Sequence, residues 1–276
     1  MPEGPEIRRA ADAIEKVLKG ERIEKVQFTQ RPLLKHQKTL SGKKVLGVET
    51  RGKALLTHFE HGWSIYSHNQ LYGVWQVVPR GEWPTTKRQL RLALHTSKHS
   101  ALLYSATDIS VWRSADLGEH HFLRKLGPDI LNPALTAAAI AQRMMEKPFA
   151  GRSLAALYLD QGFLAGVGNY LRSEILFAAG LDPLSCPRQL SATQRARLAR
   201  QTLAVSQRSY KSGGVTLTAK QYRWLTGEGL SFQRARFAVF GRADKPCHSC
   251  GNKVKRRDVG ARRLYYCSSC QAVIAP

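Results

Sequence analysis

The strongest chemical pattern in this sequence is a set of four cysteines near its C-terminal end. Cys247 and Cys250 form one Cys-x2-Cys pair, Cys267 and Cys270 form a second, and 16 residues separate the two pairs. Each pair can direct two thiolates at one metal ion, and a hairpin of this length brings the pairs together as a tetrahedron. The pattern therefore predicts one structural Zn²⁺, because four protein ligands leave no position open for a substrate.

The first residues of the sequence could supply a nucleophile. Removal of Met1 would leave Pro2 with a free secondary amine, and Glu3 and Glu6 place carboxylates within a few residues of it. An α-amino group titrates near pH 8, about two units below lysine, so more of it is neutral and able to form a Schiff base. A Met-Pro start is common, however, and carboxylates are ordinary in the first turn of a helix. The hypothesis of covalent catalysis therefore depends on other residues.

The charge of the chain indicates a polyanionic partner. Its 276 residues include 43 Lys and Arg against 20 Asp and Glu, which gives a formal net charge of +23. Such an excess is typical of nucleic-acid-binding proteins, although a ribosomal or merely basic protein would also fit. The sequence has no apolar run of the roughly 18–20 residues that a membrane helix needs, and no apolar signal peptide. We therefore expect a cytoplasmic protein, in which disulfides are rare.

The elements that must position these residues change in type along the chain. The apolar spacing of residues 5–19 predicts an amphipathic helix, with Ile7, Ala11, Ile14 and Leu18 on one face. Short strand-like runs separated by turn signals follow over residues 22–113. This part of the sequence predicts a β-sandwich or a flattened barrel.

Helical periodicity dominates residues 135–210, where Ser191 is a predicted N-cap. Within this part, Gly166-Val167-Gly168-Asn169 precedes a predicted helix. Glycines permit close backbone approach, so the amides of this turn and the side chain of Asn169 could donate to a phosphate. The glycine-rich residues 212–232 have little periodicity and predict a mobile loop.

Five motifs in this order resemble the formamidopyrimidine-DNA glycosylase superfamily, and within it the endonuclease VIII branch. They are MPEGPEIRRA, TRGKALL, SHNQLYGVW, LDQGFLAGVGNYLRSEIL and the four-cysteine hairpin, and together they cover nearly the whole chain. The resemblance implies an α+β, two-lobed protein. Its expected parts are an N-terminal catalytic β-sandwich domain with an N-terminal helix over residues 1–130, a helical helix–two-turn–helix domain over 131–235, and a zinc-bound β-hairpin over 236–276.

The resemblance also implies catalytic roles. Pro2 would attack C1′ of the damaged nucleotide, and Glu3 would be the acid–base group that assists opening of the sugar ring. Lys53 matches the proton donor of β-elimination, although alone it would be interpreted as a solvated strand lysine. Arg262 matches the arginine of δ-elimination and phosphate binding, and spacing favours it over the adjacent Arg263.

Further positions match the DNA-binding residues of the superfamily. Gln70, Leu71 and Tyr72 match a triplet that is inserted into the duplex where the damaged nucleotide leaves the stack. Without the resemblance, Leu71 and Tyr72 would be interpreted as core strand residues. Asn169 matches the phosphate clamp, and Lys125 lies where relatives tend to have arginine, so it would bind phosphate as a point charge.

The sequence thus predicts a bifunctional DNA glycosylase and abasic-site lyase of base excision repair, which excises oxidised pyrimidines through Pro2 and cleaves the strand by β,δ-elimination. The insertion triplet and MPEGPEIRRA favour this activity over that of an oxidised-purine glycosylase of the same superfamily. A non-catalytic nucleic-acid-binding zinc protein is the second alternative, since the charge and the hairpin would suit it equally. The expected partner is double-stranded DNA with a damaged base or an abasic site, bound by a monomer.

Overall fold

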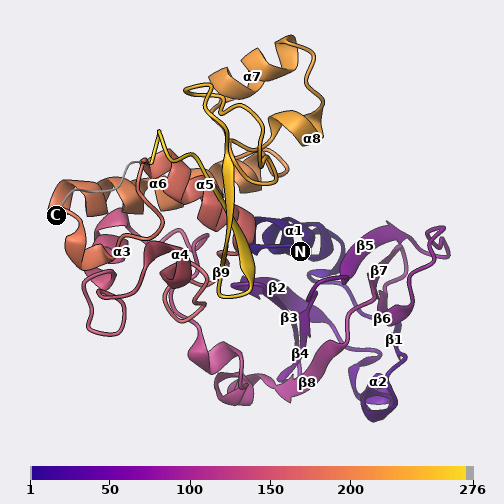
Figure 1. Ribbon diagram of the computed structural model, residues 1–276. Coiled ribbons are helices and arrows are strands. Elements are labelled where there is room, and N and C mark those ends of the chain that lie inside the picture. Colours follow the sequence, from indigo (N-terminus) through magenta and orange to yellow (C-terminus); the bar gives the residue numbers. More distant parts are fainter. Residues whose placement is uncertain (1, 272–276) are drawn as a thin grey trace. The chain divides into compact units, whose positions relative to one another are not determined.

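The computed structural model describes residues 2–271 and divides into two compact units (Figure 1). Unit 1 contains Pro2 and residues 6–125, whereas unit 2 contains residues 3–5 and the described residues from 126 onward. The last five residues of the predicted segment 236–276 lie outside the described residues. No helix in the described part of the chain is long and apolar enough to cross a membrane.

Unit 1 is built on two antiparallel four-stranded sheets (Figure 1). The first sheet has the order β1 (Lys25–Phe28), β6 (Leu90–His95), β7 (His99–Tyr104) and β5 (Val74–Pro79). The second has the order β2 (Val45–Arg51), β3 (Ala54–Phe59), β4 (Trp63–His68) and β8 (Asp108–Arg113). All eight strands lie within residues 22–113, where the sequence predicts strand-like runs.

A helix and both sheets share the hydrophobic core of unit 1. Helix α1 (Gly4–Leu18) buries Ile7, Ala11, Ile14 and Leu18, each at most 2% exposed, which confirms the predicted apolar face. The same cluster includes side chains from both sheets, as expected of a sandwich. Short helical turns complete the unit: η1 (Arg31–Leu33), α2 (His36–Leu40), η2 (Ser114–Glu119) and η3 (Leu123–Lys125).

Unit 2 is mainly helical and has a core of its own. Ser191 caps α6 as predicted, since its Oγ accepts from the backbone N–H of Gln194 at 3.2 Å. The helices are α3 (Ala137–Arg143), α4 (Leu154–Leu157), α5 (Asn169–Ala179), η4 (Pro187–Gln189), α6 (Ala192–Lys211), α7 (Ala219–Gly227) and α8 (Phe232–Ala235). The observed architecture confirms the predicted α+β class, with a β-rich first part and a helical second part.

The prediction of a loop over residues 212–232 is wrong for the part that forms α7. Thr218 Oγ1 accepts from the N–H of Gln221, and Gln221 Oε1 accepts from the N–H of Thr218, so the helix begins with a complete capping box. Leu225 is 3% exposed and packs in a cluster with Val215 and Leu217. The capping bonds and the burial of Leu225 stabilise this helix although the apolar periodicity of its sequence is weak. The glycines of the segment lie mainly at the ends of the helix.

Unit 2 ends in the predicted β-hairpin. Its strands are β9 (Lys255–Val259) and β10 (Arg262–Tyr266), which pair antiparallel, and β10 contacts α5. Gly260 and Ala261 join the strands, and their φ angles of 55° and 58° are both positive, as in the tight turns that suit strand twist. Arg262 therefore begins its strand directly after a two-residue turn.

A buried carboxylate on α5 holds the segment that leads into the hairpin. Glu174 is 2% exposed and accepts from the backbone N–H groups of Ala238, Val239 and Phe240, each at 2.8 Å. The hydroxyl of Thr216 also donates to it at 2.5 Å. Buried N–H groups need such acceptors, so this side chain fixes residues 238–240 on the helix.

Replacing Glu174 with Gln tests this interaction. The amide keeps one oxygen acceptor but turns a donor toward N–H groups, and it removes charge assistance, so we expect the free energy of unfolding to fall by about 2–3 kcal/mol. Urea unfolding of the metal-loaded protein measures this loss. Glu146→Gln is the matched control, because Glu146 pairs with Arg143 at 3.2 Å and its side chain is 47% exposed. Equal losses in the two variants would contradict the assignment.

Candidate active site and metal centre

Glu3, the predicted acid–base group, is held by the first turn of α5. It belongs to unit 2 and is 3% exposed. Its carboxylate accepts from the backbone N–H of Gly168 at 2.8 Å, Tyr170 at 2.8 Å and Leu171 at 3.2 Å. The start of a helix has unpaired N–H groups and a positive dipole end, so it favours a carboxylate there. Glu3 thus caps a helix that begins far along the chain and is fixed in one orientation.

Glycines make this approach possible. A Cβ atom on Gly168 would lie 2.4 Å from Cδ of Glu3. The N–H of Gly4 donates to the carbonyl of Gly166 at 2.9 Å, and a Cβ atom on Gly4 would lie 3.2 Å from Cα of Gly166. The backbone beside Glu3 therefore runs against residues 166–168 without intervening side chains.

Two amides of this turn, those of Gly166 and Gly168, do not have the predicted role. The N–H of Gly166 donates to Gln161 Oε1 at 3.2 Å, and the N–H of Gly168 donates to Glu3. The prediction that the amides of this turn bind a phosphate is therefore wrong for Gly166 and Gly168, because acceptors within the protein already use these two N–H groups. The side chain of Asn169 is half-buried, and its Oδ1 accepts from Arg172 at 2.6 Å.

The other predicted catalytic residues lie on both units. Pro2 belongs to unit 1, is half-buried and directly precedes Glu3. Lys53, also in unit 1, is half-buried in the two-residue turn between β2 and β3, where Gly52 has a φ of 63°. Arg262 is exposed at the start of β10 in unit 2.

The predicted insertion triplet forms an exposed turn after β4. Leu71 is 49% exposed and Tyr72 is 67% exposed, which excludes the alternative that they are core strand residues. Gln70 has a φ of 51°, its N–H donates to His68 Nδ1 at 2.9 Å, and its Oε1 accepts from Thr107 Oγ1 at 2.7 Å. The apolar tip of the turn is therefore presented to solvent from a base that hydrogen bonds hold in place.

His68 is a contributor to this turn that the sequence did not identify. Its Nδ1 accepts a hydrogen bond, so that nitrogen carries no proton in this arrangement. Burial lowers the pKa of His68, and the positive charge of Lys53 lowers it further. The carboxylate of Asp108 raises this pKa but does not cancel the lowering. The ring is thus kept in the neutral form that can accept from Gln70. A strand histidine in the sequence carries no signal of this role.

The cationic positions differ in their surroundings. Lys125 is exposed at the end of η3 in unit 1. Arg262 and Arg263 are both exposed, and as neighbours on a strand they direct their side chains to opposite faces. Exposure alone therefore does not separate Arg262 from Arg263.

Arg172 is the second residue that sequence reasoning missed. It is fully buried, and its Nη1 donates to the carbonyl of Ala155 at 3.1 Å. Its Nη2 donates to Asn169 Oδ1 at 2.6 Å and to the carbonyl of Arg263 at 3.1 Å. Its spacing of three residues from Asn169, which places both on one helix face, is the signal that could have found it.

The four predicted cysteines lie together in unit 2. Their Sγ atoms all lie within 4.8 Å of one another, with 3.9 Å between Cys247 and Cys270 and 3.5 Å between Cys250 and Cys267. Tetrahedral coordination with Zn–S bonds of about 2.3 Å places sulfurs about 3.8 Å apart. The four side chains therefore fit one metal ion, as the sequence predicts.

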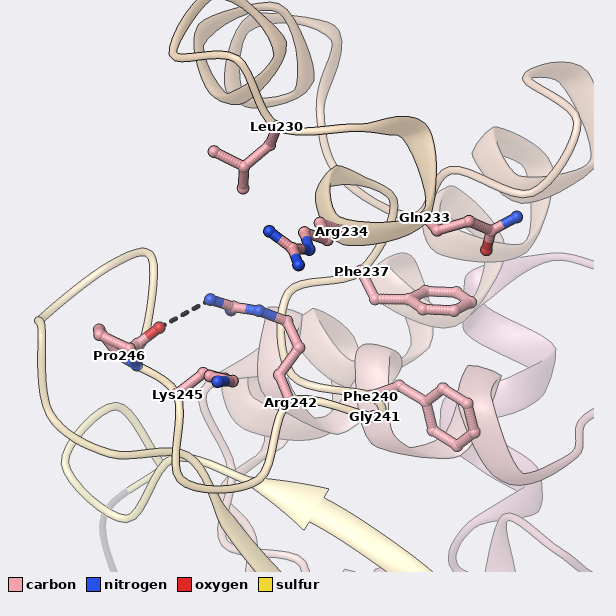
Figure 2. Close-up of a pocket in the computed structure, with 9 residues that line it drawn as sticks. All are labelled: Leu230, Gln233, Arg234, Phe237, Phe240, Gly241, Arg242, Lys245 and Pro246. Carbon is pink, nitrogen blue, oxygen red and sulfur yellow. Dashed lines mark hydrogen bonds between the residues drawn. The ribbon is translucent and has the colours of Figure 1, made fainter.

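A pocket of about 610 Å³ lies beside the segment that leads to these cysteines (Figure 2). Two of its residues, Phe237 and Phe240, pack against Tyr170 with ring centroids 5.2 and 6.1 Å apart, and the N–H of Tyr170 donates to Glu3. The guanidinium of Arg242 donates to the carbonyl of Pro246 at 2.7 Å (Figure 2). The full lining is Leu230, Gln233, Arg234, Phe237, Phe240, Gly241, Arg242, Lys245 and Pro246, which combines an apolar wall with cations.

Comparison with known proteins gives consistent similarities along the chain. The family description "Formamidopyrimidine-DNA glycosylase N-terminal domain" matches residues 1–108, and "Formamidopyrimidine-DNA glycosylase H2TH domain" matches residues 126–221. Endonuclease 8 of Escherichia coli and that of Shigella sonnei are each 45% identical to this chain over 271 residues, which is 98% of this chain and 100% of each relative.

Solved structures share the fold. Lactococcus lactis Fpg in complex with DNA that contains N7-benzyl-Fapy-dG has a TM-score of 0.80 at 20% identity. The same enzyme bound non-covalently to DNA with an AP site has a TM-score of 0.78, also at 20% identity. Each comparison covers 98% of this chain and 99% of the solved chain.

Replacing Gly168 with Ala tests the packing of Glu3 on α5. The added methyl would overlap the carboxylate, so we expect Glu3 to be displaced and the free energy of unfolding to fall by about 2–3 kcal/mol. Chemical denaturation and a crystal structure of the variant would measure both effects. Gly227→Ala is the control, because no atom lies within 4 Å of its added Cβ. An unchanged Glu3 in a stable Gly168→Ala protein would contradict this interpretation.

Proposed function

Because this chain belongs to the formamidopyrimidine-DNA glycosylase family, we propose that it is a bifunctional DNA glycosylase and abasic-site lyase. Such an enzyme releases a damaged base from double-stranded DNA and then cleaves the strand at the resulting site. One observation carries the proposal: the buried carboxylate of Glu3 is fixed by three backbone N–H groups and directly follows Pro2. A nucleic-acid-binding protein without catalytic activity has no need of this pair.

The proposed first stage uses Pro2 after removal of Met1. The lone pair of the secondary amine attacks C1′ of the damaged nucleotide, and the C1′–N bond to the base breaks with its electron pair on the base, which takes up a proton. Glu3 takes the proton that the nitrogen of Pro2 loses and delivers it to O4′ as the C1′–O4′ bond opens, which leaves an iminium between Pro2 and C1′. General acid catalysis of this kind requires a carboxyl group held within hydrogen-bond reach of the reacting oxygen.

The proposed second stage cleaves the strand. Loss of a proton from C2′ expels the 3′ phosphate as the C3′–O3′ bond breaks, and Lys53 is the proposed proton donor. Loss of a proton from C4′ then expels the 5′ phosphate as the C5′–O5′ bond breaks, with Arg262 as the residue proposed to assist this step and to bind the phosphate. Water hydrolyses the iminium and regenerates the amine of Pro2. An arginine suits a phosphate because it stays protonated and presents paired donors.

We further propose how the protein holds the duplex. Asn169, Lys125 and Arg262 bind phosphates, and the exposed turn of Gln70, Leu71 and Tyr72 enters the space that the damaged nucleotide vacates. The exposure of Leu71 and Tyr72 supports this role, because an apolar wedge offsets part of the lost stacking. The triplet favours oxidised pyrimidines as substrates. Cleavage of duplexes that each carry one defined oxidised base would rank them.

Zinc is the metal we assign to Cys247, Cys250, Cys267 and Cys270. A Zn²⁺ ion with four thiolates is structural and stabilises a small module that has little core of its own. The cysteines hold the hairpin that presents Arg262, and no catalytic step uses the metal. We expect the protein to act as a monomer.

Covalent trapping tests the nucleophile. Borohydride reduction of the protein mixed with abasic-site duplex should yield a stable adduct, which mass spectrometry should locate on Pro2 of the chain without Met1. Glu3→Ala, compared at matched DNA occupancy, should lose most strand cleavage. An adduct located on a lysine, or binding without cleavage by the wild type, would contradict the mechanism.

Two substitutions test the division between positioning and insertion. Asn169→Ala should weaken binding of damaged and undamaged duplexes alike, by about tenfold, because a phosphate contact carries no sequence information. Leu71→Ala should bind nearly as well but process lesions about tenfold more slowly, because extrusion loses its wedge. Titrations at several salt concentrations and single-turnover cleavage separate these effects. Lys125→Ala serves as a reference, since loss of one charged phosphate contact lowers the salt slope by about 1. Reversed phenotypes would contradict the assignment.

A further inference from the structure

One nitrogen of a buried arginine contacts both the proposed phosphate clamp of unit 2 and the strand that carries Arg262. Nη2 of Arg172 donates to Oδ1 of Asn169 at 2.6 Å and to the carbonyl of Arg263 at 3.1 Å. Asn169 is the proposed phosphate clamp, and Arg263 directly follows Arg262 on β10. Arg172 itself is fully buried, so it does not contact DNA.

The first contact determines which way the Asn169 amide faces. A guanidinium has donors and no acceptor, so it can pair with the amide oxygen and not with the amide nitrogen. With Oδ1 turned toward Arg172, the NH₂ group of Asn169 lies on the other arm of the amide and can donate to a phosphate. The Asn169 amide could otherwise face either way, and Arg172 thus holds it with the NH₂ group free to donate.

The second contact fastens the strand that carries Arg262. Arg172 binds the carbonyl of Arg263, and two residues further the N–H of Tyr265 donates to Ser173 Oγ at 3.3 Å. Residues 263 and 265 are alternate positions, so their backbone groups face the same edge of the strand. One edge of β10 pairs with β9. Two consecutive residues of α5, Arg172 and Ser173, bind backbone groups of β10.

Stability alone does not account for a guanidinium at this position. A cation in the first turn of a helix opposes the helix dipole, and burial of a charge has a large desolvation cost. Burial lowers the pKa of Arg172 to about 10, partly offset by the carboxylate of Glu3, while Arg262 adds to the lowering. Its Nε also has no hydrogen-bond partner among the described residues. The arginine therefore makes its three Nη hydrogen bonds while its Nε stays unpaired within the described part of the chain.

We propose that Arg172 is a positioning residue, which sets the Asn169 amide and the Arg262 strand together for one stretch of DNA backbone. The proposal rests on the proposed function for the identity of the ligand. Lysine cannot replace it, because a single ammonium lacks the planar fork that spans Ala155, Asn169 and Arg263.

Arg172→Lys is the first test, with Arg143→Lys as matched control. Arg143 also donates to two backbone carbonyls of unit 2, of Phe163 at 2.9 Å and Gly162 at 2.7 Å, and these bonds involve neither Asn169 nor β10. We expect Arg172→Lys to bind duplex with a tetrahydrofuran abasic analogue about tenfold more weakly, and the control to stay within about twofold. Equal losses in both variants would overturn the proposal.

The products of strand cleavage give a readout that general destabilisation does not move. With natural abasic-site duplex, Arg172→Lys should still form the borohydride adduct, while the ratio of δ- to β-elimination ends falls about tenfold because Arg262 is misplaced. Zinc content and Tm are measured alongside. An unchanged product ratio would overturn the link to Arg262.

A double-mutant cycle tests the link to Asn169. If Arg172 acts partly through that amide, Arg172→Lys should weaken binding of the tetrahydrofuran duplex by a smaller factor in the Asn169→Ala background than in the wild type. Additive losses would overturn the link.

Asn169→Asp tests the inferred amide orientation without any change to Arg172. The carboxylate still accepts from Arg172 but has no NH₂ group, so it should bind DNA at least as poorly as Asn169→Ala. Wild-type affinity of Asn169→Asp would overturn the inferred amide orientation, even if Arg172→Lys fails to fold.

Tetrahydrofuran duplex has no glycosidic bond to break, so these affinities remain measurable if the wild type neither traps nor cleaves DNA. That failure would count against the proposed function alone.

Discussion

The carboxylate of Glu3 on the first turn of α5 is the interaction on which the rest of the proposed site depends. It places the third residue of the chain against a helix that begins at Asn169, and the fit allows no side chain at Gly168. A helix start provides N–H groups and a positive potential, so it holds a buried carboxylate that hydrophobic packing alone would reject. Pro2 directly precedes this buried carboxylate in the sequence.

Helix α5 then organises unit 2 through three consecutive polar residues. Arg172 binds the carbonyl of Arg263, Ser173 accepts from Tyr265, and Glu174 binds the turn over residues 238–240. These side chains point to different parts of the chain because successive residues of a helix are about 100° apart. One short helix therefore fixes the Glu3 carboxylate, the Asn169 amide and the hairpin. These polar contacts add to apolar packing, since Phe177 of α5 packs against the buried cluster of the hairpin.

The sequence predicts the elements well because their signals are local. Period-two runs, an amphipathic first helix and paired cysteines depend on neighbours in sequence, and the structure contains each of them. The fixed orientation of Glu3, by contrast, depends on partners 165 or more positions away. The glycine-rich turn before Asn169 suggests a phosphate site on local grounds, while the amides of Gly166 and Gly168 donate to Gln161 and to the distant Glu3. Arg172 was missed because a helical arginine is usually exposed.

The hairpin shows why such contacts matter for function. Its buried cluster has few members, Val239, Cys247, Val254 and Cys267 among them, so it has too little core to define its own position. A metal on the four cysteines stabilises the module internally, yet it does not fix the module on α5. The buried arginine and serine of α5 supply that second constraint, with bonds to the backbone edge of β10. In the proposed assignment, zinc maintains the hairpin internally and Arg172 positions it on α5.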